Sequence, residues 1–255
     1  MLKRILIMLI LLLVFNPTKV FAGWYRCYNF NGTIGLHPVT LSIQIRPGFF
    51  GEQGKKDFNV IGVYKYNQYN NPISLEGIID FKTNKALLYE VDDTANKAIF
   101  EFQFLEGNCS GTWKNLNTNK VLPLHLNYVL KLTDTTGTGE FNNIEILQKK
   151  SLKGFYFTGI YSKKSGDEKA HMDKLKIISK KDNTVFQIID FSKVKSATGN
   201  MYTIIYDNVQ LTNAKANEFA VSNDIGRVGG LLTITYSTRA HKFKLNPVPE
   251  LDGPD

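Results

Sequence analysis

The sequence has few of the residues that build disulfide frameworks, metal sites or membrane spans. Its 255 residues contain two cysteines and four histidines, too few for a disulfide-rich miniprotein or a large metal array. After residue 22, no apolar run approaches the 18 residues that a membrane-spanning helix needs. We therefore expect a globular protein without stable membrane insertion, without a metal site and without a cofactor.

Motifs that carry enzymatic chemistry are missing as well. The chain contains no Gly-x-Ser-x-Gly elbow, no His-Glu-x-x-His, no Walker loop, no dinucleotide glycine fingerprint and no EF-hand loop. The carboxylates around His171 are interleaved with lysines, which is typical of a solvated loop. We therefore expect a protein that is not an enzyme. A wall hydrolase with paired carboxylates drawn from Glu76, Glu90 and Glu101 remains an open alternative.

The first 22 residues have the layout of a secretory signal peptide. Lys3 and Arg4 precede an unbroken apolar run over residues 5–15. Val20 and Ala22 then provide small to medium-sized side chains at positions −3 and −1 of a cleavage site after Ala22. Eleven apolar residues are too few to span a bilayer as a helix. We expect cleavage after Ala22 and a periplasmic product, with secretion as the alternative.

Export also bears on the two cysteines. Cys27 and Cys109 would enter a compartment that oxidises thiols. A bond between them would close a long loop, which the chain-entropy account values at roughly 4–5 kcal/mol. The sequence therefore predicts a disulfide between Cys27 and Cys109.

Hydrophobic periodicity points to strands throughout the chain. Residues 38–45 alternate between apolar and polar side chains, which predicts a half-buried strand. A second β-prone run over residues 59–66 is followed by an Asn-rich turn over residues 67–71. Many short strands at near-regular spacing predict an all-β protein with an antiparallel meander barrel or sandwich.

Residues 132–143 form a polar stretch with few apolar side chains, which divides the chain into two candidate β-domains. Residues 23–130 carry 10 basic and 9 acidic side chains, whereas residues 131–255 carry 18 and 14. Nucleic acid is not expected as a partner, because the chain is expected to be exported and contains no nucleic-acid recognition motif. The expected domains are a signal peptide over residues 1–22, a disulfide-tied β-domain over 23–131, a linker over 132–143, a second β-domain over 144–247 and a flexible tail over 248–255.

The first half contains a set of spaced aromatic and glycine motifs. They are Tyr64-x-Tyr66, Leu75-x-Gly77, Leu88-Tyr89-Glu90 and Gly111-x-Trp113. This pattern resembles a recurrent module of exported bacterial proteins and covers about 100 residues. The resemblance implies an antiparallel β-meander and assigns no particular activity. The glycines would permit close backbone approach, and the large rings would fill a small barrel.

The second half carries a strand, a Lys-Lys-Asp-Asn turn and a second strand over residues 175–189. This arrangement resembles the periplasmic β-domains of lysozyme inhibitors and of immunity proteins against wall-degrading toxins. The resemblance implies a protein partner, whose cleft a loop over residues 162–174 would plug. The candidate partner-binding residues are Tyr161 as an aromatic anchor, Ser162, Lys163, Lys164, Ser165, Gly166 and His171.

Together these observations predict an exported periplasmic binding protein. It would inhibit or neutralise a cell-wall-targeting toxin or a lysozyme-like hydrolase by occlusion. The basic second half favours a neutral or acidic protein partner over a strongly cationic one. The alternative is a calycin-like barrel that binds a small ligand or lipid within an apolar mouth.

Overall fold

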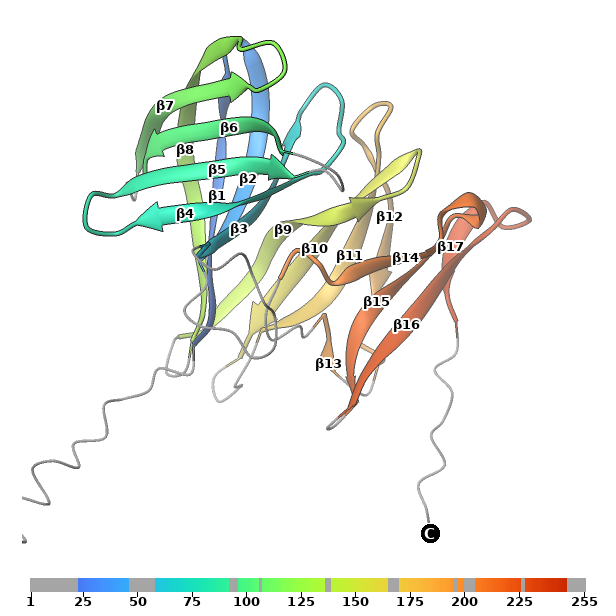
Figure 1. Cartoon of the computed structure of the whole chain (residues 1–255). Helices are drawn as coiled ribbons and strands as arrows, with labels where there is room; N and C mark the ends of the chain where they lie inside the picture. The colour runs from blue at the N-terminus through green and yellow to red at the C-terminus, as the bar shows by residue number, and fades with distance from the viewer. Residues whose placement is uncertain are drawn as a thin grey trace, which may run out of the picture.

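The protein is all-β and antiparallel, with a closed barrel followed by two further sheets (Figure 1). The computed structural model describes residues 23–45, 58–91, 96–105, 107–135, 139–164, 170–194, 197–199, 205–225 and 228–246. This architecture confirms the predicted fold class. The expected signal peptide over residues 1–22 and the expected tail over residues 248–255 lie outside the described residues.

The barrel is an eight-stranded meander. Each strand pairs with the next, and β1 also pairs with β8, so closure leaves the sheet without a free edge. The strands are β1 (Gly23–Ile34), β2 (His37–Ile45), β3 (Val60–Tyr66), β4 (Ile73–Asp80), β5 (Lys85–Val91), β6 (Asn96–Gln103), β7 (Asn108–Asn115) and β8 (Val121–Thr135).

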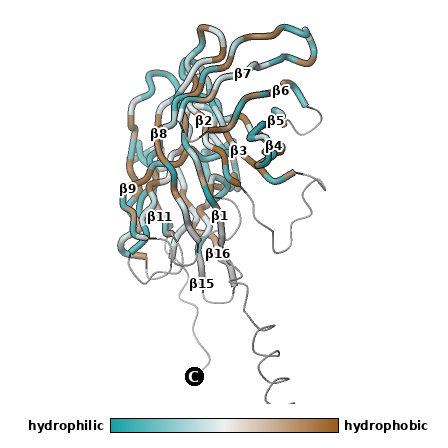
Figure 2. The backbone as a smooth tube through the Cα atoms, turned by 90° about the vertical axis from the view of Figure 1, so that its left-hand side faces the viewer, coloured by the Kyte–Doolittle hydropathy of each residue, from teal (hydrophilic) through white to brown (hydrophobic). Residues whose placement is uncertain are grey.

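Large side chains fill the barrel interior. Hydrophobic and hydrophilic residues are interspersed along the strands (Figure 2), as expected where one face is the core. Phe30, Tyr64 and Phe100 are 0% exposed, and the rings of Tyr64 and Phe100 meet edge to face at 5.0 Å. These three side chains are therefore fully buried.

The spaced motifs of the first half converge inside this barrel. A Cβ on Gly77 would lie 2.1 Å from the carbonyl oxygen of Leu87, so only glycine permits this close approach between strands. The Trp113 indole donates to the buried Glu90 carboxylate at 2.8 Å, and the Tyr64 hydroxyl donates to the same oxygen. The motif residues thus form a hydrogen-bonded interior cluster.

The second unit consists of two sheets that pack face to face. Strands β9 (Phe141–Ser151), β10 (Phe155–Lys163), β11 (His171–Ser179) and β12 (Val185–Asp190) form the first sheet. The second sheet comprises β13 (Ala197–Thr198), β14 (Val209–Asn213), β15 (Glu218–Ile225), β16 (Val228–Ser237) and β17 (Lys242–Leu245). Between the two sheets, the ring centroids of Phe157 and Phe219 lie 4.5 Å apart. We call this unit the sandwich.

One short 3-10 helix, η1 (Ala214–Ala216), interrupts the sandwich. Its Asn213 side chain accepts a hydrogen bond from the Ala216 backbone N–H, which caps the turn. Within the described ranges, no helix has the length and apolar character that crossing a bilayer requires.

The barrel and the sandwich share a buried junction. Strand β3 is buried on both faces, because its alternate residues face the barrel interior and the sandwich. Cys27, Ile61 and Val63 point outward from the barrel and join the hydrophobic core of the sandwich. The Gln44 side chain accepts a hydrogen bond of 3.0 Å from the Ile205 backbone N–H, also within this buried junction.

The segment expected as a linker is mostly strand. Strand β8 runs to Thr135 and β9 begins at Phe141, so both ends of residues 132–143 are hydrogen-bonded. Leu132 is fully buried in the core that the two units share. The composition of this stretch indicated a polar connection, but burial of Leu132 depends on packing against distant strands.

The predicted disulfide is wrong, because both cysteines are free and buried. Cys27 on β1 faces the sandwich, whereas Cys109 on β7 faces the barrel interior. Their partners on the intervening strand, Leu132 and Leu126, are six residues apart on β8, or about 20 Å at the rise of a strand. A disulfide needs Cα atoms within about 7 Å.

Both thiols are expected to be free and slow to react in the native protein. Burial raises the pKa of Cys27 to about 12 and also raises the pKa of Cys109, so neither forms a thiolate readily at neutral pH. Labelling with a maleimide, without reductant, should add two labels in guanidinium and few in native buffer. Mass spectrometry that finds no labelling and a loss of two hydrogens would contradict this assignment.

The Glu90 cluster should stabilise the barrel measurably. Glu90→Ala leaves the Trp113 N–H and the Tyr64 O–H buried without their acceptor, which should cost about 2–4 kcal/mol. Glu90→Gln retains an acceptor oxygen and should cost less. Guanidinium unfolding checks this against Glu101→Ala, an exposed control on β6. Equal unfolding midpoints for the two alanine variants would show that the cluster contributes nothing.

Candidate functional site

The prediction that Tyr161 is an aromatic anchor for a partner is wrong. It is 0% exposed, because its strand position faces the core of the sandwich rather than solvent. Its hydroxyl donates to the Ile205 carbonyl at 2.8 Å and accepts from Asn208 at 2.6 Å. Burial raises its pKa. Tyr161 therefore stabilises the fold and offers no surface to a partner.

Three of the remaining candidate residues, Ser162, Lys163 and His171, lie on strands β10 and β11 rather than in the loop predicted over residues 162–174. Ser162 on β10 pairs in register with His171 on β11, and its hydroxyl donates to Asn142 at 2.8 Å. Lys163 is buried and Lys164 is exposed. Ser165 and Gly166, the two candidates in the middle of the predicted loop, lie outside the described residues.

A cleft of about 400 Å³ with mixed polar and apolar lining opens where the barrel meets the sandwich. Sequence reasoning did not find it, because its walls come from strands far apart in the chain. We call it the junction cleft. It is lined by Asn29, Phe30, Asn31, Thr40, Ser42, Lys65, Asn67, Val129, Leu130, Glu145, Leu147, Tyr156, Thr158, Ile178 and Asn183.

The barrel wall of the cleft is a polar row across three strands. Asn31 on β1 pairs with Thr40 on β2, which pairs with Lys65 on β3. Directly paired residues of neighbouring strands point to the same face. Because the residues next to them in sequence face the barrel core, alternation places this row outside. The Thr40 hydroxyl donates to Asn67 at 3.0 Å, which ties the row to the following turn.

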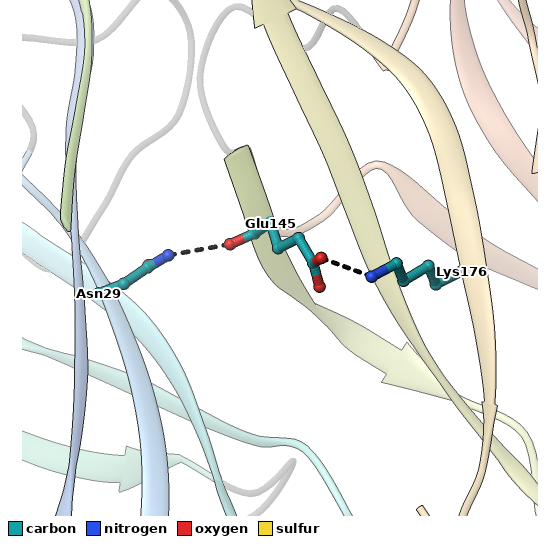
Figure 3. Close-up of polar contacts among 3 residues, drawn as sticks. All are labelled: Asn29, Glu145 and Lys176. Atoms are coloured by element: carbon teal, nitrogen blue, oxygen red, sulfur yellow. Dashed lines mark hydrogen bonds and ion pairs between the residues drawn. The ribbon is translucent and has the colours of Figure 1, made fainter. Parts of the chain in front are cut away.

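A side-chain contact fixes the opposite wall against the barrel (Figure 3). The Asn29 amide donates to the Glu145 carbonyl oxygen at 2.9 Å and accepts from the Ser42 hydroxyl at 2.7 Å. The carboxylate of Glu145 on β9 is paired with the ammonium of Lys176 on β11 (Figure 3). The acidic side chain of the cleft is therefore already engaged.

Two turns that each contribute a residue to the cleft also contact each other. The Asn-rich turn over residues 67–71, which the structure confirms as a turn, contacts the Lys-Lys-Asp-Asn turn of the sandwich. The Asn70 amide donates to the Lys180 carbonyl at 3.2 Å, and the Lys180 ammonium donates to Asn71 at 2.7 Å. Asn70 has a φ of 54°, a left-handed conformation that asparagine tolerates.

Lys65 is the charged residue at the base of the cleft. Its side chain is 6% exposed, and its ammonium donates to Asn67 at 3.2 Å and to Asn70 at 2.8 Å. It also lies 4.9 Å from the centre of the Tyr156 ring. Within the described part of the chain, Lys65 forms no ion pair. Burial lowers its pKa to about 8.

Among the glutamates considered for paired-carboxylate chemistry, Glu90 is separated from Glu76 by the barrel wall. Glu90 lies inside the barrel, bonded to Trp113 and Tyr64. Glu76 pairs in register with Tyr89, the neighbour of Glu90, and therefore points to the opposite face of the sheet. In the ranges that the structure describes, no group of three or more His, Cys, Asp or Glu side chains could hold a metal ion.

Comparisons with known proteins add no relative. No protein-family model matches the chain, and neither a curated protein nor a solved structure matches it significantly.

The low pKa of Lys65 should appear in the pH dependence of stability. The unfolded chain retains this proton up to about pH 10.5, whereas the folded protein releases it near pH 8. Between these values the unfolded state binds more protons, so stability rises with pH. From pH 7 to pH 10, the unfolding free energy of the wild type relative to Lys65→Met should rise by roughly 2 kcal/mol.

Urea unfolding at several pH values measures this difference. Lys85→Met, which removes an exposed lysine of the barrel, serves as the matched control. A difference for Lys65→Met that does not change with pH would show that the Lys65 ammonium is as well solvated in the fold as in the unfolded chain.

Proposed function

We propose that the protein is an exported, periplasmic binding protein that neutralises a cell-wall-targeting toxin or a lysozyme-like hydrolase. The observation that carries this proposal is the junction cleft, which both units form together and near which hydrogen bonds join the two units. A concave surface that combines apolar lining with a few placed polar groups is typical of recognition sites. The resemblance of residues 175–189 to inhibitor and immunity domains supports a protein partner.

The mode of occlusion differs from a simple plug. The concave cleft would receive a projecting part of the partner, while the exposed surfaces around it cover the partner's own site. Val129 at the cleft is 49% exposed and offers an apolar contact at its edge. Binding energy at such interfaces is concentrated in a few contacts around a central pocket.

The calycin-like alternative receives less support. The closed eight-stranded barrel has the expected topology. However, its interior is occupied by Phe30, Tyr64 and Phe100, which are all 0% exposed. A lipid would have to displace a close-packed core, and such repacking is costly.

Purified wall hydrolases test the proposed function directly. A panel of neutral and acidic glycosidases, amidases and endopeptidases is assayed by the clearing of a wall suspension, with and without the protein. We expect the protein to inhibit at least one of them. Deletion of its gene should also sensitise the source cell to rivals that deliver such toxins.

Two substitutions of equal exposure locate the binding surface. Val129→Arg blocks the cleft, whereas Leu231→Arg alters β16, and the two side chains are 49% and 50% exposed. Val129→Arg should weaken inhibition at least tenfold, while Leu231→Arg should retain it. If no hydrolase is inhibited and the deletion strain is no more sensitive, the proposed function is wrong.

A further inference from the structure

We propose that the junction cleft binds an acidic side chain of the partner protein, whose carboxylate contacts Lys65 and the cleft asparagines. This inference rests on the proposed function, because it specifies the chemistry by which the same surface recognises a protein. It identifies the partner's contact group as an aspartate or glutamate that projects from its surface.

The first support is the ammonium of Lys65. Buried charges are usually paired, since removing an ion from water is costly unless an opposite charge compensates it. The neighbours of Lys65 are amide oxygens and an aromatic ring, which satisfy its hydrogen bonds without neutralising its charge. Glu145 lines the same cleft, but its carboxylate is paired with Lys176. The cleft therefore has an uncompensated positive charge.

The second support is the orientation of two asparagine side chains. The side-chain oxygen of Asn67 accepts a hydrogen bond from the Thr40 hydroxyl, and that of Asn183 accepts one from the Tyr156 hydroxyl. Each of these two oxygens is thus occupied, and the NH2 groups of both side chains have no partner among the described residues. The walls consequently offer donors at these two positions. A carboxylate is an acceptor-only group with two oxygens, which matches such walls.

The third support distinguishes a side chain from a sugar. Saccharide recognition would use an exposed aromatic face, but Tyr156 is 4% exposed and Lys65 lies over its ring. The cleft also has apolar lining from Val129, Leu130, Leu147 and Ile178. A carboxylate on a short methylene stem, flanked by apolar neighbours, satisfies both kinds of wall. The net positive charge of residues 131–255 adds long-range attraction for an acidic partner.

Two model peptides test this chemistry without the natural partner. One is a blocked Gly-Val-Glu-Val-Gly peptide, and the other carries Gln in place of Glu. Sodium acetate serves as the free-carboxylate probe. Titrations are followed by the side-chain NH2 resonances of Asn31, Asn67 and Asn183 in two-dimensional NMR spectra of the full mature chain.

The Glu peptide should shift these resonances saturably, and the Gln peptide should bind at least tenfold more weakly. Lys65→Met should weaken Glu-peptide binding about tenfold, whereas Lys85→Met, an exposed control, should leave it unchanged. Asn31→Leu, at an exposed strand position, gives a second variant that retains Lys65 and should weaken binding about threefold. Binding of acetate with no gain from the peptide would indicate a site for free anions and overturn the inference.

The outcome is separable from that of the proposed function. Equal binding of the Glu and Gln peptides, or no binding of either, overturns the carboxylate inference even if a wall hydrolase is inhibited. Conversely, specific binding of the Glu peptide together with a lack of inhibition across the hydrolase panel would retain the carboxylate site and refute the proposed class of partner.

Discussion

The structure depends on one constraint, which is that the barrel wall formed by β1, β2 and β3 is buried on both of its faces. Its inner side chains, such as Phe30 and Tyr64, complete the barrel core, and its outer side chains meet the sandwich. Buried polar groups on the outer face therefore need partners. Asn29 finds the Glu145 carbonyl and Gln44 finds the Ile205 amide, and these bonds fix how the two units meet.

The cleft is the place where this double burial ends. Successive outward rows of the wall change from apolar contact around Cys27 and Ile61, through the Asn29–Ser42 row, to the Asn31–Thr40–Lys65 row that lines the cleft. In this last row, Lys65 is hydrogen-bonded to Asn67 and Asn70 of its own unit. The hydrogen bond between Asn70 and Lys180 joins the two units at the turns beside the cleft.

The sequence predicts the strands, the turns and the antiparallel barrel, because alternation and turn residues are local signals. It predicts a half-buried strand over residues 38–45, yet the last five residues of that strand are all buried. Alternation places the polar side chains Ser42 and Gln44 on the solvent face. Both are buried instead, because the sandwich that covers them is formed by residues much later in the chain. The disulfide prediction is wrong for a related reason. The pairing of distant strands places Cys27 and Cys109 on opposite faces of the barrel wall, and no signal near either cysteine indicates this. No signal within one segment could bring together the walls of the cleft.

The Tyr64-Lys65-Tyr66 segment shows why core and site are inseparable in this protein. Strand alternation sends Tyr64 to Glu90 inside the barrel and Lys65 to the cleft outside. The Tyr64 hydroxyl bonds to Glu90 from one face of β3, and Lys65 lies on the other face of the same strand. The backbone of β3 therefore links the hydrogen-bonded cluster inside the barrel to the positive charge of the cleft. A fold built in this way can keep an uncompensated lysine because the barrel core stabilises the strand that carries it.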